Sequence, residues 1–460
     1  MTRFGFAKRY IGDAEFYSRA GRVAFPVALQ SMITIGVNML DTVMLGRLGE
    51  TALSSSALAN QFIGIYHICC MGIGMGASVM MSRYWGMKEL CSLRQTVTVM
   101  LRICAAVGMV FTLVTLLAPT QIMRVYTPEA DVIQDGVGYF RLSALSYLLT
   151  GFSLTLSIAL RSVGLAGIPL LSACSSFSVN LLCNWIFIFG NLGAPRLETA
   201  GAALGTLIAR AVELVILGGY FFFFDARIRY RVNDLFFSCR TILPEYLRIS
   251  VPVIVSDSLM AFGNSAVAMI MGRIGAGFVA ANSITFVTQQ LTMVLTQGVS
   301  QAGCIITGNT LGEGRREQAF AEGYWFTFLG TALGVIACLV ILCISRPVTG
   351  FYRVMPETRA IALDLMHAVA FLLIFQSANS ILTKGVLRGG GDTKFLMFAD
   401  VFFLWAASVP LGILAGLYWK LPAFWIYFFM KIDQIIKCAV CMYRLRSGRW
   451  IKDIYAAETV

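Results

Sequence analysis

The chain contains two copies of one hydrophobic unit. Two stretches that lie 226 positions apart read almost the same, Val43-Met44-Leu45-Gly46-Arg47-Leu48-Gly49 and Met269-Ile270-Met271-Gly272-Arg273-Ile274-Gly275. The same offset aligns four further pairs without a gap: Pro26 with Pro252, Asn38 with Asn264, Gly72 with Gly298 and Gly86 with Gly312. Internal repeats of this kind are typical of membrane transporters, in which the substrate is handled between the two halves.

The composition is that of an integral membrane protein. Hydrophobic residues make up 58% and charged residues 13% of the 460 residues, and the mean hydropathy is +0.75, whereas soluble domains carry about 25% charged residues. A bilayer core about 30 Å thick requires about 20 apolar residues of helix. Such runs predict an all-α fold with about twelve transmembrane helices over residues 24–45, 55–81, 97–118, 137–160, 168–190, 200–223, 249–271, 279–307, 322–345, 361–384, 394–417 and 421–443.

The longest hydrophilic interval predicts the boundary between the copies. It divides the chain into an amino-terminal six-helix lobe (1–224), a cytoplasmic linker (225–248) and a carboxyl-terminal six-helix lobe (249–460). Because each copy has an even number of spans, the copies are predicted to be parallel repeats related by an axis along the membrane normal. The linker is too short for a nucleotide-binding domain, so no nucleotide is expected as a partner.

The basic residues predict the orientation in the membrane. The net charge is +12, but Lys and Arg lie in short connections rather than on one basic face, which argues against nucleic acid as a partner. Most of them fall in the alternate set of connections that includes both termini, so both termini are predicted to be cytoplasmic. Residues 1–22 lack the apolar stretch of a signal peptide, and the first span is expected to remain in a multi-pass protein of the cell (inner or plasma) membrane.

Metal and catalytic constellations are not expected. The twelve cysteines lie mostly in apolar spans, where a thiol behaves as a small hydrophobe, and the Cys438-Ala-Val-Cys441 spacing has no partner ligands. His67 and His367 have no second His or Cys at ligand spacing, so no metal site is predicted. A membrane-embedded enzyme would need clustered His, Cys or paired carboxylates, and the chain is therefore not expected to be an enzyme.

Asp41 lies deep in the first span and is the main candidate for ion coupling. A carboxylate there costs about 2.5–3.5 kcal/mol on insertion scales, so it is predicted to face the bundle interior or a watery cavity. Burial favours the neutral acid, which makes Asp41 a candidate proton carrier. Nearby oxygen ligands would suit Na⁺ instead, and a purely structural carboxylate is the remaining alternative.

Partners for Asp41 are available in the same copy. Asn180 and Asn184 lie four residues apart on one face of the fifth span, and Thr206 begins the sixth. Each alone is as typical of a hydrogen bond between membrane helices. Pro26 and Gln30 lie one turn apart in the first span, where proline permits a bend, so this helix is predicted to gate when Asp41 changes charge.

A set of motifs stands in a specific order along the chain: Pro26 and Gln30, then Asp41 with the Gly46-Arg47-Leu48-Gly49 turn, then Gly201-Ala202-Ala203, and then Arg388-Gly389-Gly390-Gly391-Asp392-Thr393-Lys394. In this set and order, nearly the whole chain resembles the multidrug and toxic compound extrusion (MATE) family. The resemblance implies two six-helix lobes around a central cleft. It also implies secondary active antiport by alternating access, in which organic, often cationic and amphipathic compounds are exported in exchange for inward H⁺ or Na⁺, with no cofactor.

The resemblance also carries site residues over. The family's amino-lobe cation network falls on Asp41, Asn180 and Thr206, with Asn184 at the position where the family usually has Asp. Because an amide releases no proton, this difference weakens a two-carboxylate Na⁺ site and favours Asp41 acting with H⁺. Other family members place the essential acid in the carboxyl lobe, where Asp257 is the candidate and a local ion pair is the alternative.

The remaining intramembrane polar residues divide into pairs and candidate substrate contacts. Arg210 and Glu213, three apart, and Asp433 and Lys437, four apart, are expected to pair, and Asp400 is a weaker site candidate without a partner near it in sequence. The eighth span carries several amides, Gln289, Gln290, Gln297 and Gln301. With 33 Phe and 21 Met they predict an adaptable apolar wall with polar anchors for varied ligands.

Two other functions remain open at this point. A flippase for lipid-linked oligosaccharides or other lipids, from the wider superfamily, would require a basic hydrophilic cleft, and the amides and methionines argue against one. A channel would conduct ions without alternating access. The expected partners are a small organic substrate and membrane lipid, and the protein is expected to act as a monomer.

Overall fold

The computed structural model describes residues 12–352 and 355–453, and these ranges contain helices and no strand. The first copy forms α2 (Ala14–Gly46), α3 (Glu50–Met87), α4 (Leu90–Leu117), α5 (Pro119–Tyr126), α6 (Ala130–Ser143), α7 (Ser146–Ser162), α8 (Gly167–Phe189) and α9 (Glu198–Gly219). The second forms α10 (Leu243–Ile274), α11 (Ala276–Thr292), α12 (Val294–Gly312), α13 (Arg316–Phe351), α14 (Pro356–Ser380), α15 (Thr393–Phe403), α16 (Val409–Ile413), α17 (Ala423–Met430) and α18 (Asp433–Ser447).

Short turns of other helix types continue or join these helices. The π-helical turns are η2 (Tyr220–Phe224), η4 (Ile381–Leu387), η5 (Leu404–Ser408) and η6 (Leu414–Tyr418), and the 3₁₀ turns are η1 (Asn191–Gly193) and η3 (Val232–Phe236). Within the described residues, nine helical segments are long and apolar enough to cross a membrane, or up to eleven if each of two bent pairs is one span. The predicted all-helical membrane fold is therefore confirmed.

Two of the predicted spans are bent, a feature that the sequence analysis did not address. The predicted span 137–160 is bent by 50° between α6 and α7, and the predicted span 279–307 is bent by 47° between α11 and α12. At the first bend, hydroxyl groups donate hydrogen bonds to carbonyls that the break leaves without a helical partner. Thr112 Oγ1 donates to the Ala144 carbonyl at 3.0 Å, and Ser146 Oγ donates to the Ser143 carbonyl at 2.6 Å. Hydropathy is the same for a straight and a bent span, so the sequence pattern did not distinguish them.

The predicted last span, 421–443, is also two helices rather than one. It is broken between α17 and α18 at Lys431 and Ile432, and the backbone N–H of Asp433, the first residue of α18, donates to Ser408 Oγ at 3.1 Å. Because α18 is polar, this segment is not among the spans counted above. That it crosses the membrane stays a prediction.

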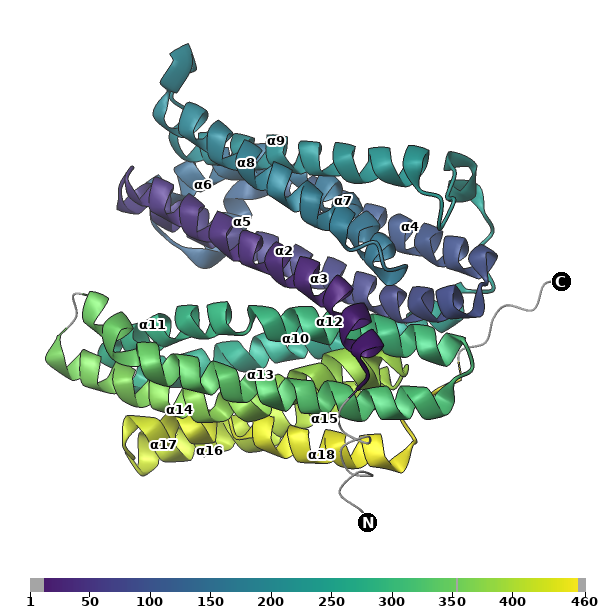
Figure 1. Ribbon diagram of the computed structural model, residues 1–460. Coiled ribbons are helices and arrows are strands. Elements are labelled where there is room, and N and C mark those ends of the chain that lie inside the picture. The colour runs from purple at the N-terminus through teal and green to yellow at the C-terminus, as the bar shows by residue number, and fades with distance from the viewer. Residues whose placement is uncertain (1–11, 353–354, 454–460) are drawn as a thin grey trace. The chain divides into compact units, whose positions relative to one another are not determined.

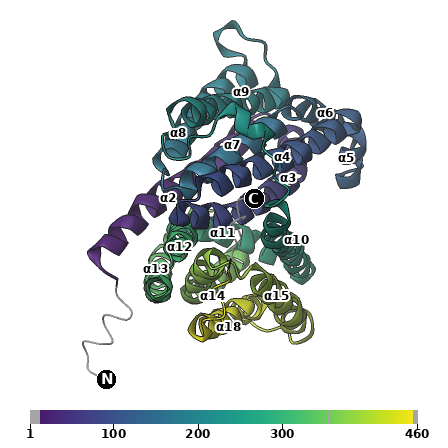
Figure 2. The same ribbon diagram turned by 90° about the vertical axis from the view of Figure 1, so that its right-hand side faces the viewer.

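By internal contacts the described residues form two compact units. The amino-terminal unit comprises residues 29–81 and 88–254, and the carboxyl-terminal unit comprises residues 12–28, 82–87 and the described part of 255–453. In the amino-terminal unit, α8 and α9 pack lengthwise side by side (Figure 1). In the carboxyl-terminal unit, α14 packs against both α13 and α18, as is seen nearly end-on in Figure 2.

Repeat-equivalent residues meet inside the carboxyl-terminal unit, where the last turn of α3 crosses α12. A Cβ atom on Gly86 would overlap the carbonyl of Asn309, and a Cβ atom on Gly312 would overlap the carbonyl of Arg83. At the offset of 226, Gly312 is the equivalent of Gly86 and Asn309 is the equivalent of Arg83. The two contacts are therefore equivalent under the repeat offset.

Gly312→Val is expected to lower the yield of folded protein, because backbone atoms of α3 leave no room for a side chain. Overpacking of this kind costs about 1–3 kcal/mol or more. The yield of monodisperse protein and its melting temperature measure the effect. Gly272→Val is the matched control, since a Cβ atom on Gly272 meets nothing within 4 Å. Equal losses in both variants would show that the crossing is not the cause.

Candidate functional site

Three helices of the amino-terminal unit bring four predicted site residues together, and we call these four the Asp41 network. Asn184 Nδ2, on α8, donates to Oδ1 of Asp41, on α2, at 2.6 Å and to Oδ1 of Asn180 at 3.2 Å. Asn180 Nδ2 in turn donates to Oγ1 of Thr206, on α9, at 3.4 Å. One continuous chain of side-chain hydrogen bonds therefore joins α2, α8 and α9.

Close packing of α8 against α9 positions the network. Gly201 and Gly205 lie one turn apart on α9, and a side chain on Gly201 would overlap the backbone of Phe187. A Cβ atom on Gly205 would overlap the amide oxygen of Asn184. Small residues spaced in this way let membrane helices approach closely. Because Gly205 occupies so little space, the buried Asn184 amide lies directly against α9 and directs its Nδ2 toward Asp41.

The network contains one ionisable side chain among three neutral ones. Asp41 is half-buried, whereas Asn180 and Asn184 are 4% and 1% exposed. The amide oxygen of Asn184 is buried and finds no hydrogen-bond partner among the described residues, a situation that costs about 1–3 kcal/mol. A proton on Asp41, or a monovalent cation beside these oxygens, would supply what they lack.

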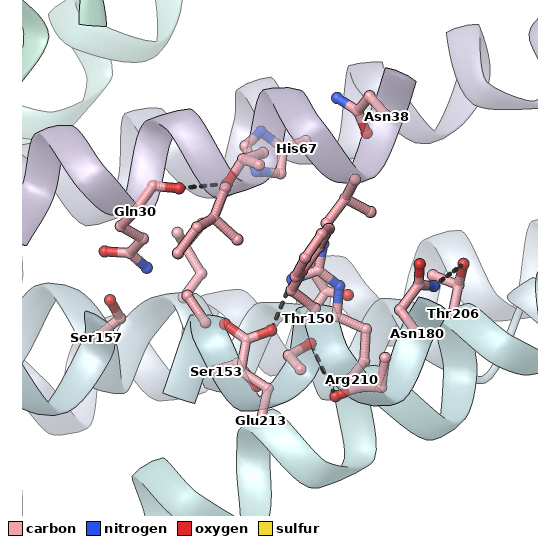
Figure 3. Close-up of a pocket in the computed structure, with 18 residues that line it drawn as sticks. Gln30, Asn38, His67, Thr150, Ser153, Ser157, Asn180, Thr206, Arg210 and Glu213 are labelled. Atoms are coloured by element: carbon pink, nitrogen blue, oxygen red, sulfur yellow. Dashed lines mark hydrogen bonds and ion pairs between the residues drawn. The ribbon is translucent and has the colours of Figure 1, made fainter. Parts of the chain in front are cut away.

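A cavity of about 120 Å³ lies next to the network, within the same unit. Asn180 and Thr206 line one end of it, so the network opens to the cavity. Figure 3 shows Gln30, Asn38 and His67 on one side and Ser157, Glu213 and Arg210 on the other. The helix α2 runs unbroken through Pro26 and contributes Gln30 to the lining.

The wall of the cavity formed by α9 carries an ion pair. Arg210 Nη1 donates to Glu213 Oε2 at 2.6 Å, which confirms the predicted pair. Sequence analysis missed that this pair lines the cavity, together with the hydroxyls of Ser153 and Ser157 on α7. A signal was available, because Ser153, Ser157 and Arg161 recur every four residues and form a polar stripe in an otherwise apolar span.

The predicted residues of the carboxyl-terminal unit are dispersed. Asp257 Oδ1 lies 3.7 Å from Arg388 Nη2, in an ion pair in which Arg388 is 4% and Asp257 27% exposed. Gln289 Nε2 donates to Gln376 Oε1 at 2.7 Å, between α11 and α14. Gln301 lies on α12, so the bend at Met293 separates it from Gln289.

Asp400 has a partner that the sequence did not indicate. Lys437 Nζ lies 2.9 Å from Asp433 Oδ2, as predicted, and 3.4 Å from Asp400 Oδ1. The absence of a neighbour in sequence was therefore misleading, because the partner of Asp400 comes from α18. Within residues 12–352 and 355–453, no group of three or more His, Cys, Asp or Glu side chains is placed to hold a metal ion.

A duplicated bundle of membrane helices with an ionisable side chain beside an interior cavity is characteristic of membrane transporters. The family model described as MatE matches residues 26–186 and 252–414. The chain belongs to this family, which confirms the resemblance identified from its motifs.

Relatives and solved structures agree with this assignment. The chain is 24% identical over 440 residues to a probable multidrug resistance protein NorM of Mesorhizobium japonicum, with 93% of each chain covered. It is 22% identical over 455 residues to a probable multidrug resistance protein NorM of Thermotoga maritima, with 98% of this chain and 97% of the relative covered. Its fold is similar to a crystal structure of MATE in the bent conformation, with a TM-score of 0.86, 17% identity and coverage of 98% and 99%.

A mutant of the Vibrio cholerae MATE transporter VcmN has a similar fold, with a TM-score of 0.87, 15% identity and coverage of 95% and 98%. At these identities the solved structures establish the fold. The chain is thus a multi-pass membrane protein of a transporter family.

Proposed function

We propose that the chain is an antiporter of the cell membrane that exports small organic compounds in exchange for inward H⁺. The observation that carries this proposal is the Asp41 carboxylate, held by Asn184 at 2.6 Å on a helix that also lines an interior cavity. Multidrug resistance is what the names of the NorM relatives state of those proteins. Alternating access, rather than catalysis or nucleotide hydrolysis, then moves the substrate.

The composition of the network supports H⁺ over Na⁺. A bound proton neutralises the single carboxylate, whereas Na⁺ would find one charged ligand and only neutral oxygens besides. When Asp41 is protonated, its hydroxyl becomes a donor, and a turn of the Asn184 amide would present its unpartnered oxygen as the acceptor. Proton uptake therefore exchanges one hydrogen bond for another and changes the contact between α2 and α8.

The helix α2 couples this change to the cavity. Pro26 has no backbone N–H, so one hydrogen bond of α2 is missing one turn before Gln30. A weaker contact between Asn184 and Asp41 then allows α2 to bend at Pro26, and Gln30 moves with the helix. In this way proton binding from outside changes the lining of the cavity and releases the substrate.

The remaining assignments complete the proposal. The lobes are 1–224 and 249–460, the linker 225–248 joins them, and both termini are cytoplasmic. A coupling or substrate-binding role of Asp257, Gln289 and Gln301 in the second lobe stays a prediction, since the cavity lies within the amino-terminal unit. The protein functions as a monomer in lipid without cofactor, nucleotide or nucleic acid.

Reconstitution into proteoliposomes tests the coupling ion. Efflux of a fluorescent organic cation is followed while a pH gradient and a Na⁺ gradient are imposed separately. We expect the pH gradient alone to drive efflux and the Na⁺ gradient alone to leave it at the level of empty liposomes. Efflux that follows Na⁺ and ignores pH would assign Na⁺ as the coupling ion.

Asn184→Asp is expected to add a response to Na⁺. The substitution places a second carboxylate 2.6 Å from Asp41 in place of the amide nitrogen, and two carboxylates with the Asn180 and Thr206 oxygens suit a hard cation. The Na⁺ gradient alone should then drive efflux at least several-fold above the wild-type level. A variant that still ignores Na⁺ would show that Asn184 does not determine ion choice.

A further inference from the structure

The Arg210–Glu213 pair presents unused polar atoms to the cavity. Only Nη1 of Arg210 and Oε2 of Glu213 form the hydrogen bond between them, so it leaves the other nitrogens of Arg210 and Oε1 of Glu213 unused. The Arg210 side chain is 34% exposed and lines the cavity. The pair can therefore offer a ligand both a guanidinium edge and a carboxylate oxygen.

Two buried hydroxyls on α7 lie on the same cavity. Ser153 and Ser157 are 1% and 2% exposed, and neither Oγ atom finds a hydrogen-bond partner in the described part of the chain. Both line the cavity, as Figure 3 shows. Buried polar groups in folded proteins are nearly always hydrogen-bonded, so these two hydroxyls, one turn apart, are available to polar atoms of water or of a ligand in the cavity.

The size of the cavity limits this ligand. Its volume is about 120 Å³, and a cavity of about 150 Å³ accommodates benzene. The space therefore suits a molecule of roughly six non-hydrogen atoms, the size of a small amino acid.

The charges select the class of ligand. Because Arg210 and Arg161 both offset the charge of Glu213, a simple organic cation gains little by entering and meets a guanidinium as well as the carboxylate. A zwitterion meets both with opposite charge, since arginine binds carboxylates in a two-pronged geometry and glutamate accepts from an ammonium group.

We infer that this cavity binds a zwitterion the size of an amino acid, with its carboxylate on Arg210, its ammonium group on Glu213 and polar side-chain atoms on Ser153 and Ser157. The inference rests on the proposed function, because it names a substrate class for the same cavity. It departs from the organic cations that the family resemblance implies.

Equilibrium binding to the purified full-length protein tests this inference. Isothermal titration calorimetry in detergent is carried out with the twenty L-amino acids, and the tightest binder is compared with its methyl ester and its N-acetyl derivative. We expect at least one amino acid to bind and each blocked derivative to bind at least tenfold more weakly. Binding of the cationic ester as tight as that of the parent, or no binding by any amino acid, would overturn the inference.

A double variant removes both charges at once and so avoids leaving either one unpaired. Arg210→Met with Glu213→Met is expected to lose amino-acid binding at least tenfold while its melting temperature stays near that of the wild type. Ser153→Ala with Ser157→Ala should weaken binding less. The matched control is Glu245→Met with Arg248→Met, because Glu245 and Arg248 form an ion pair of the same spacing at 3.3 Å on α10, away from the cavity lining. If the Arg210/Glu213 and the Glu245/Arg248 double variants lower amino-acid binding equally, the cavity is not the binding site.

The outcome is separable from that of the coupling experiment. Binding is measured without any ion gradient, so a failure of the zwitterion inference leaves proton-driven dye efflux intact. A failure of the proposed coupling leaves amino-acid binding and its dependence on Arg210 and Glu213 intact.

Discussion

Asp41→Asn is expected to abolish proton-driven efflux while the protein stays folded. Asparagine has nearly the shape of aspartate and can still accept a hydrogen bond from Asn184, which now lies 2.6 Å from the carboxylate. It can neither take up nor release a proton, so the protein loses the group through which the pH gradient drives transport. Dye efflux driven by the pH gradient should fall to the level of empty liposomes, and the melting temperature should change little.

A second carboxylate of the same unit provides the control. Asp135 accepts a hydrogen bond from Ser55 at 2.5 Å and is half-buried on α6, away from the cavity lining. Asp135→Asn is therefore expected to keep proton-driven efflux. Undiminished efflux by Asp41→Asn, or equal loss in both variants, would remove Asp41 from the role of coupling residue.

The charge of the substrate decides how much energy the exchange has available. If one H⁺ enters for each monovalent cation that leaves, no net charge crosses the membrane, and only the pH gradient contributes, about 1.4 kcal/mol per unit. A zwitterion carries no net charge, so each exchange moves one positive charge inward. A potential of 100 mV then adds about 2.3 kcal/mol. Export of a zwitterion should accordingly respond to the potential, whereas export of a monovalent cation should not.

The sequence predicts the helices and the Asp41 network for identifiable physical reasons. Hydropathy marks a span wherever about 20 apolar residues follow one another, and the offset of 226 marks the repeat that later appears in the contacts of Gly86 and Gly312. Asn180 and Asn184 were recognised because four residues make one helical turn. Asp41 was singled out because a carboxylate deep in an apolar span is costly.

The features that the sequence did not indicate depend on changes in the direction of a helix axis and on contacts between residues far apart in the sequence. A bend at Met293 leaves the hydropathy of residues 279–307 unchanged, since apolar side chains suit either half. The contact between Asp400 and Lys437 joins two helices whose packing no local spacing fixes. The cavity likewise arises where five helices fail to fill the space between them, so the roles of Ser153 and Ser157 emerged only in three dimensions.

The two copies differ at the positions of their ionisable side chains. Asp41 corresponds to Val267, which is 2% exposed and belongs to the apolar core of the carboxyl-terminal unit. Asp257 corresponds to Ser31. Ionisable groups therefore occupy different positions in the two copies. Asp41 lies beside the neutral amide of Asn184 and forms no salt bridge within the described chain. Asp257, by contrast, forms an ion pair with Arg388.

Lys437→Met is expected to destabilise the protein by about 3–5 kcal/mol, the cost of leaving a buried charge without its partner. Lys437 is fully buried, and its ammonium group is shared by Asp433 and Asp400. Without it, two carboxylates remain inside the carboxyl-terminal unit without their ion-pair partner, and Asp433 keeps a hydrogen bond from Ser408 at 2.8 Å. Thermal unfolding in detergent, followed by tryptophan fluorescence, measures the loss.

Neutralising one of the stranded carboxylates should restore part of this stability. Asp433 lies closer to Lys437 than Asp400 does, so Lys437→Met with Asp433→Asn should unfold at a higher temperature than Lys437→Met alone. Lys452→Met is the control: it removes an ion pair with Asp392 at 3.7 Å, but Lys452 is 46% exposed and Asp392 keeps Arg444 at 2.7 Å. Exposed pairs contribute at most about 1 kcal/mol. If the two lysine variants unfold at the same temperature, the burial of Lys437 carries no special cost, and the Asp400–Lys437–Asp433 cluster does not stabilise the fold.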